Sequence, residues 1–286
     1  MALTMAQGQR TMRSVYHCNG EERVINSLSR GLQALAIMAR SDGPLGVTEL
    51  AEALGGDPSS SYRLLATLEN HGFARQEAQG KKYTLGYAAL DLASAVLRQL
   101  EVAGLAGPHL RRLVGRTGES AHLAVQDGTR AVFVGQEMAT ATLRVDTAIG
   151  SFEPVHCTAV GKALLTALPD AELEALFPDG MLPRHTGQTI TSLPELLGEL
   201  ARTRARGYAS DDEEMHPGVR CLAASIRNHQ GQVIASAGIS GPTTRLTRER
   251  LFALAAEVRV AADAIAAEMG YKTSGYMTGG EEWPRV

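Results

Sequence analysis

Residues 57–70 read DPSSSYRLLATLEN and decide the fold of the first part of the chain. Asp57 is a good N-cap and Pro58 suits the first helical position, so the stretch predicts a helix with a defined start. At about 100° per residue, its leucines gather on one side with the small Ser61, and its polar side chains gather on the other. The helix therefore has one face for a core and one face of hydroxyls, an arginine and an amide.

The segments on either side of this helix complete a small domain. Leucines at helical spacing predict two helices before it, around Leu28–Ala39 and Leu50–Leu54. After it, residues 73–77 and 81–85 are extended runs joined by Ala78-Gln79-Gly80, which indicates a hairpin. Three short helices and a hairpin are the pattern of a winged helix-turn-helix, whose third helix enters the major groove of DNA.

The polar face of the third helix carries groups that can read DNA. Hydroxyls and amides donate to phosphates and base edges, and arginine can bind guanine in two places at once. Two lysines follow the hairpin tip, where a wing would meet the DNA backbone. The alternative is a merely solvated face, because residues 1–86 carry nine basic and eight acidic side chains. The predicted DNA-binding residues are Ser59, Ser60, Tyr62, Arg63, Thr67, Lys81 and Lys82.

The composition of the 286-residue chain narrows the other possibilities. Its net charge of −3 gives no general case for nucleic-acid or membrane binding. No apolar run approaches the roughly 18 to 20 residues that cross a bilayer, and the first thirty residues lack the apolar core of a signal peptide. We therefore expect a cytoplasmic protein with no membrane partner. Its three cysteines form no CxxC pair, which argues against a disulfide framework.

The second half of the chain mixes helices and strands. Residues 120–125 and 131–136 flank an Asp127-Gly128 turn, and residues 219–227 and 233–239 flank a polar turn in the same way. Two antiparallel pairs are therefore expected. Helical patterns cover 105–116, 158–168, 192–206 and 247–269, the third opened by the capping box Ser192-Leu193-Pro194-Glu195. The fold class is α+β, with helices flanking an antiparallel sheet.

Residues 87–103 (YAALDLASAVLRQLEVA) are predicted to form one helix with a narrow apolar stripe. The stripe suits a helix from a second copy of the chain, so oligomerisation is expected to be built in. The alternative is that the stripe packs within the chain on the first helix, Leu28 to Ala39. Its members are Leu90, Ala93, Leu97 and Leu100.

Motifs in both halves resemble those of one family, the IclR-type bacterial transcriptional regulators. The N-terminal motifs are Val47–Glu52, Ser59–Glu69, Gly72-Phe73 and Tyr83–Gly86. The more specific C-terminal motifs are Gly150, Pro154, His156, Thr158–Leu165, Gly207-Tyr208, Asp211–Glu214, Gly218, Cys221 and Ser240–Pro242. The resemblance implies a winged helix-turn-helix joined by a linker helix to a GAF-like effector domain. It also implies a homodimer or homotetramer on a partly palindromic duplex operator, more often as a repressor.

The resemblance completes the expected organisation of the chain. Small organic acids are the effectors that it implies for the C-terminal domain. The expected parts are a mobile tail at 1–22, a winged helix-turn-helix at 23–86, a linker helix at 87–103, an effector-binding domain at 104–271 and a mobile tail at 272–286.

An effector site follows from the same resemblance. Relatives that bind small carboxylates use backbone amides at the start of the helix that begins here at Thr158, where free N–H groups and the helix dipole attract an anion. Gly238 departs from a serine of the carboxylate-binding relative. The missing hydroxyl would enlarge the pocket, so we expect an acid larger than glyoxylate. The implied effector-binding residues are Val145, His156, Thr158, Ala159, Val160, Asp211, Val219, Cys221, Gly238 and Ser240.

Several of these residues admit a plainer interpretation. Cys221 alternates with apolar neighbours and is as compatible with a buried structural thiol. His156 can satisfy a loop carbonyl, and residues 211–214 can be a solvated charge run. A zinc site of His156, Asp211, His216 and Cys221 has suitable ligands but irregular spacing. We expect neither a metal nor another cofactor.

An enzyme and a thiol redox sensor are two further functional classes for this sequence. No nucleophile motif, Walker loop or GxGxxG followed by an acidic residue is present, so no enzyme activity is expected. A thiol redox sensor using Cys157 or Cys221 is the alternative to the acid-responsive regulator. It requires an accessible thiol of low pKa.

Overall fold

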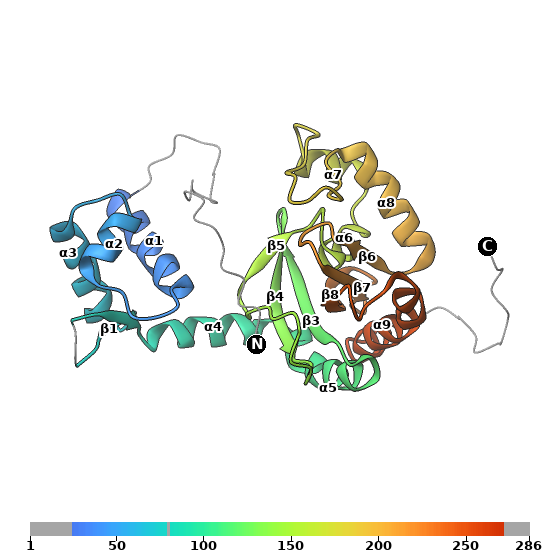
Figure 1. Cartoon of the computed structure of the whole chain (residues 1–286), viewed down its shortest axis with the longest axis horizontal. Coiled ribbons are helices and arrows are strands. Elements are labelled where there is room, and N and C mark those ends of the chain that lie inside the picture. Colours follow the sequence, from blue (N-terminus) through green and yellow to red (C-terminus); the bar gives the residue numbers. More distant parts are fainter. Residues whose placement is uncertain (1–24, 79–80, 272–286) are drawn as a thin grey trace. The chain divides into compact units, whose positions relative to one another are not determined.

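The computed structural model describes residues 25–78 and 81–271, which form two compact units that divide near Leu100 (Figure 1). The tails expected at 1–22 and 272–286 lie outside the described residues, as do Gln79 and Gly80 at the expected hairpin tip. Among the described residues, no helix combines the length and apolar character needed to cross a membrane.

The first unit is the winged helix-turn-helix that the sequence predicts. Its third helix begins as expected, because the Asp57 carboxylate accepts a hydrogen bond from the Ser60 amide at 2.8 Å and Pro58 takes the first helical position. Leu50, Leu65 and Tyr83 are central to its small core. The elements are α1 (Asn26–Arg40), α2 (Val47–Ala53), α3 (Pro58–Asn70), β1 (Ala74–Gln76), β2 (Tyr83–Leu85) and α4 (Ala88–Gln99).

The single helix predicted over residues 87–103 is wrong. Helix α4 ends at Gln99, Leu100 has the non-helical angles φ −97° and ψ 85°, and α5 (Glu101–Thr117) starts after it. The break has a physical reason in the different surroundings of the two helices. Helix α4 buries none of its side chains, whereas α5 buries Val102 and Ala106 in the core of the second unit.

The second unit is built on a six-stranded antiparallel sheet with strand order β5-β4-β3-β8-β7-β6. Both predicted hairpins, β3–β4 and β7–β8, are confirmed, and β3 pairs with β8 to join them. The edge strands β5 and β6 were not predicted. The strands are β3 (Ser120–Asp127), β4 (Arg130–Glu137), β5 (Phe152–Pro154), β6 (Ala209–Asp212), β7 (Val219–Arg227) and β8 (Val233–Pro242).

Helices cover both faces of this sheet, which confirms the α+β class (Figure 1). Helices α5 and α9 pack together on one face, and α6 packs on the other, beneath α8. The Ser236 hydroxyl donates to the Val160 carbonyl at 2.9 Å and fastens β8 to α6. The remaining helices are α6 (Ala159–Leu165), α7 (Asp170–Leu176), α8 (Leu193–Arg206) and α9 (Arg248–Glu268), of which α7 was not predicted.

Candidate functional site

Helix α3 presents the predicted polar face to solvent. Tyr62 is 56% exposed, and Arg63 lies beside it on the open side of the helix. Ser61 and Leu65 are buried on the opposite side, as the helical pattern predicts. Ser59 and Thr67 are also exposed, and Ser60 is half-buried. The Thr67 hydroxyl donates to the Arg63 carbonyl at 2.8 Å, so its oxygen remains available as an acceptor.

The two lysines of the hairpin differ in their surroundings. Lys81 is exposed and adopts a positive φ of 54°. Lys82 places its Nζ 3.2 Å from Glu49 Oε1 and so ties the hairpin to α2. Such an exposed ion pair is weak, but it holds the ammonium away from an approaching phosphate. Lys81 is therefore the freer of the two to meet DNA.

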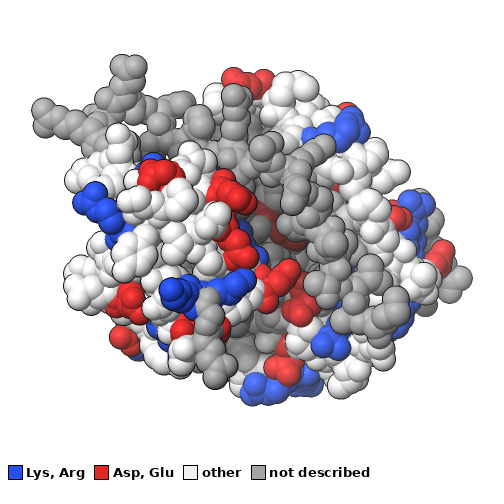
Figure 2. Space-filling view, turned by 60° about the vertical axis from the view of Figure 1, so that its left-hand side comes forward, with Lys and Arg blue, Asp and Glu red and all other residues white. Residues whose placement is uncertain are grey.

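Charge on the visible surface is mixed. In Figure 2, basic and acidic side chains are interspersed over the described residues, without one extended basic patch. This agrees with the near-neutral charge of residues 1–86. Affinity for a polyanion would therefore depend on a few well-placed side chains and on a second copy of the unit.

A pocket lies between the start of α6 and the strands β6, β7 and β8. Nine of the ten predicted effector-binding residues line it, although they come from widely separated parts of the chain. They are Val145, Thr158, Ala159, Val160, Asp211, Val219, Cys221, Gly238 and Ser240. The pocket is also lined by Phe133, Thr147, Glu153, His216, Leu222 and Ile239.

Three polar groups of the pocket share one row across the sheet. Asp211 on β6 is opposite Cys221 on β7, which is opposite Ser240 on β8. The Cys221 thiol hydrogen-bonds with both neighbours in this row. Asp211 is only 2% exposed and accepts a hydrogen bond from the Glu214 amide at 2.7 Å. Burial, reinforced by the negative charge of Glu214, raises the pKa of Asp211 to about 7.

The start of α6 supplies donors to the same pocket. Thr158 caps the helix, since its hydroxyl oxygen accepts from the Gly161 amide at 3.2 Å and donates to the Pro154 carbonyl at 2.9 Å. Within residues 25–78 and 81–271, the amides of Ala159 and Val160 have no hydrogen-bond partner. The pocket thus combines free N–H groups with a carboxyl group that is half protonated near neutral pH.

The expectation that Gly238 enlarges the pocket is wrong. A Cβ atom at this position would lie 2.2 Å from the Leu222 carbonyl oxygen and 2.8 Å from the Ala223 Cβ. The glycine is therefore needed for the close approach of β8 to β7, and it adds no space for a ligand. The structure thus removes the size argument against a ligand as small as glyoxylate.

His156 is the predicted effector-binding residue that does not line the pocket. Its imidazole is buried and its Nε2 lies 2.9 Å from the Pro183 carbonyl oxygen. The plainer interpretation, that this histidine satisfies a loop carbonyl, describes the observed contact.

Two histidines near the pocket are not among the predicted effector-binding residues. His216 is 3.1 Å from Glu153 Oε1, and this hydrogen bond raises its pKa. His122 packs its ring edge against Phe133 and is 1% exposed. Neither of its ring nitrogens has a partner among the described residues, and burial lowers its pKa to about 4. The hairpin pattern puts His122 on a strand, but it carries no signal for the face on which that strand packs.

The surroundings of Cys157 and Cys221 do not support a redox sensor. Burial raises the pKa of each thiol well above its ordinary value. A protonated, enclosed thiol reacts poorly with peroxide. The zinc site considered for His156, Asp211, His216 and Cys221 is not assembled within the part of the chain that the structure describes, because no three of these residues bring ligand atoms together.

Comparisons with known proteins agree with both units. The family model described as "IclR helix-turn-helix domain" matches residues 27–78, and the one described as "Bacterial transcriptional regulator IclR C-terminal" matches residues 94–267. The HTH-type transcriptional repressor AllR of Salmonella typhi is 34% identical over 246 residues, which cover 86% of this chain and 90% of the relative. The transcriptional repressor IclR of Escherichia coli (strain K12) is 35% identical over 248 residues, with coverage of 86% and 90%.

Solved structures show the same architecture. The crystal structure of Thermotoga maritima IclR superposes with a TM-score of 0.73 and 30% identity, covering 87% of this chain and 100% of that one. A regulator from Rhodococcus sp. RHA1 gives a TM-score of 0.75 and 30% identity, covering 86% of this chain and 99% of that one. Family models match both units of the chain, and the relatives that it resembles regulate transcription. The chain is a DNA-binding transcriptional regulator rather than an enzyme, and it belongs to the IclR family.

Proposed function

We propose that the protein is a repressor whose affinity for a partly palindromic duplex operator is controlled by a small organic acid in the pocket at the start of α6. In this proposal residues 23–86 bind DNA, α4 serves as the linker, and the unit that begins near Leu100 binds the effector. Relatives named as repressors support the direction of regulation. One observation above all supports the effector site. The row of Asp211, Cys221 and Ser240 lines the same pocket as the amides of Ala159 and Val160, which have no hydrogen-bond partner among the described residues.

Asp211 explains how an anion can bind beside an acidic side chain. A carboxylate that approaches the amides of Ala159 and Val160 would be repelled by an ionised Asp211. With a pKa near 7, Asp211 is readily protonated and then donates a hydrogen bond to the ligand. A short organic acid with a carboxylate and one further polar group matches this set of donors and acceptors.

The exposed apolar side chains of α1 and α4 support a homo-oligomer. Helix α4 buries none of its residues, so the alternative in which its stripe packs on α1 within one chain loses its basis. Leu28 and Leu32 of α1 are exposed as well. Such side chains are stabilised by contact with a second copy. The exposed large apolar residues of this region are Ile25, Leu28, Leu32, Tyr87, Leu90, Leu92 and Val96.

The test of the proposed function uses the full chain and an operator that it selects from random duplex DNA. Calorimetry with glyoxylate, pyruvate and benzoate measures acid binding, and footprinting with and without each acid measures the response. We expect at least one acid to bind with one site per chain and to change DNA affinity, since equal binding to both states shifts nothing. DNA binding without any response to the acids, at concentrations well above those in cells, would overturn the effector assignment.

Light scattering tests the oligomer. The parent is expected to be a dimer or tetramer at micromolar concentration. Leu90→Glu places a charge on the apolar stripe of α4 and should shift the chain toward the monomer, whereas Arg98→Glu on the same helix is the matched control. A monomeric parent contradicts the oligomer.

A further inference from the structure

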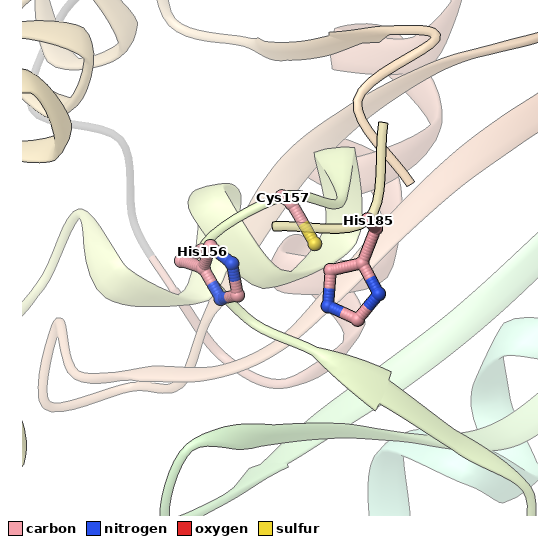
Figure 3. A group of neighbouring side chains, drawn as sticks. All are labelled: His156, Cys157 and His185. Carbon is pink, nitrogen blue, oxygen red and sulfur yellow. The ribbon is translucent and has the colours of Figure 1, made fainter. Parts of the chain in front are cut away.

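A second cluster of polar side chains lies outside the effector pocket. His156, Cys157 and His185 bring one ligand atom each to within 4.8 Å of one another. Figure 3 shows the Cys157 sulfur pointing toward the space between the two imidazole rings. The first two residues precede α6 directly, and the third lies on the loop before α8. None of the three lines the pocket.

The two histidines are held in place by hydrogen bonds of the backbone around them. His156 donates its Nε2–H to the Pro183 carbonyl at 2.9 Å, which leaves the Nδ1 lone pair free. A ring N–H donated to a backbone carbonyl is the usual support of a metal-bound histidine. The His185 amide donates to Thr189 Oγ1 at 3.0 Å, and that hydroxyl donates to the Glu214 carbonyl at 2.6 Å. These hydrogen bonds fix the backbone of the exposed loop at His185.

We propose that His156, Cys157 and His185 form a binding site for a borderline-soft divalent metal ion of the zinc type. Two imidazoles and one thiolate match the ligand preference of Zn²⁺, whereas Ca²⁺ and Mg²⁺ require oxygen ligands. Three protein ligands leave a fourth tetrahedral position open. The Met215 Sδ lies 3.6 Å from Cys157 Sγ.

The electrostatic surroundings favour a cation in this place. Burial, and then the nearby carboxyl groups of Asp211, Glu214 and Glu153, raise the pKa of the Cys157 thiol, and Lys162 acts in the opposite direction. In the metal-free protein these effects hold the proton on the sulfur. A metal ion replaces that proton, because a coordinated thiol is deprotonated outright. Of the three residues, His185 is exposed, whereas His156 and Cys157 are buried.

The position of the cluster links it to regulation. Cys157 is followed by Thr158, the cap of the helix whose amides line the pocket. A metal ion would tie this segment to the loop that carries His185. Metal occupancy is then expected to alter acid affinity, although the metal site itself does not depend on the proposed effector.

Cobalt titration of the full, untagged, reduced chain tests the site. His17 and Cys18 are replaced by Ala and Ser throughout, so that the N-terminal tail cannot supply ligands. Co²⁺ serves as the probe because a thiolate ligand gives a near-ultraviolet charge-transfer band and a tetrahedral site gives intense visible bands. We expect both bands to saturate at one ion per chain and to disappear when Zn²⁺ is added.

Matched variants assign the ligands. Cys157→Ser should remove the charge-transfer band. His185→Ala should weaken zinc binding by at least about tenfold, because loss of a group that only supports a metal ligand already lowers metal affinity by about that factor. Competition with a chromogenic chelator measures the zinc affinity. Cys221→Ser and the exposed-histidine variant His229→Ala should leave both readouts unchanged. Because His185 is exposed, its variant remains informative even if Cys157→Ser misfolds. No thiolate band in the parent, or zinc affinity unchanged in His185→Ala, overturns the site.

Discussion

The exposed face of α3 and the pocket beside α6 use polar side chains in opposite ways. On α3, Tyr62 and Arg63 are exposed, on the side of the helix opposite the buried Ser61 and Leu65. Around the pocket, Asp211, His122 and Lys162 are almost completely enclosed. On α3, the side chains proposed to bind DNA contribute little to the stability of the fold. Around the pocket, the same side chains serve both stability and binding.

This difference determines what a substitution reports. A change on the α3 face should alter DNA affinity and leave the free energy of unfolding unchanged. A change near the pocket alters desolvation and hydrogen bonding inside the fold, so binding measurements there require a stability control.

The largest effect is expected at the buried ion pair of Lys162 and Glu214. The Lys162 side chain is 1% exposed and Glu214 is its charge partner. Lys162→Met should lower the free energy of unfolding by about 3–5 kcal/mol, because it leaves Glu214 buried without a counter-charge. Denaturant unfolding followed by circular dichroism measures this loss. The double variant Lys162→Met/Glu214→Gln should regain much of it, and a single variant as stable as the parent contradicts the coupling.

Arg63→Ala should weaken operator binding by about 1–3 kcal/mol and relax specificity at one base pair, if Arg63 reads a guanine. Its unfolding curve should match that of the parent. Arg63→Lys retains the charge but not the two-point geometry, and it therefore separates base reading from phosphate attraction. Binding measurements on operators with single base changes provide the readout. Equal affinity and an equal footprint for Arg63→Ala would refute the role.

Acid binding should depend on pH through Asp211. Its pKa near 7 lies above the unfolded value, so the proton is present below neutrality and is lost as pH rises. The ligand carboxylate stays ionised over this range. Affinity should therefore fall from pH 6 to pH 8, approaching a tenfold loss per unit above pH 7. Asp211→Asn keeps a neutral donor and should flatten the profile in calorimetry. A flat profile in the parent contradicts the protonated aspartate.

The smallest contrast lies within the hairpin. Lys81→Gln should reduce the slope of log affinity against log salt by about 0.9, the contribution of one phosphate contact. Lys82→Gln should change it less, because Lys82 is already paired with Glu49. Equal slopes for the two variants would show that the Glu49 pair gives way on DNA.

Much of the fold could be predicted because local signals specified it. The Asp57 cap, the helical leucine spacing of α3 and the turns of two hairpins are encoded within a few residues of each element. The edge strand β6 was missed because its Asp211-Asp212 reads as part of a charge run, and only pairing with β7 makes it a strand. The break at Leu100 was missed because it depends on burial of Val102 in another unit.

The residues of the candidate site could be predicted where they belong to a family motif. They could not be predicted where their role depends on how distant parts of the chain pack together. The start of α6 and the row Asp211, Cys221 and Ser240 followed from the family resemblance. The effect of Gly238 did not, because the contact that excludes a side chain there comes from the neighbouring strand. The convergence of Cys157 with His185 also depends on loops far apart in sequence.

The most direct test measures operator affinity with and without acid in three proteins: the parent, Arg63→Ala and Asp211→Asn. The acid is the one that calorimetry identifies. We predict that Arg63→Ala binds acid as the parent does but binds DNA weakly. Asp211→Asn should bind DNA as the parent does, while its response to acid no longer varies between pH 6 and pH 8. Loss of acid binding in Arg63→Ala, or a response in Asp211→Asn with the pH dependence of the parent, would contradict these predictions.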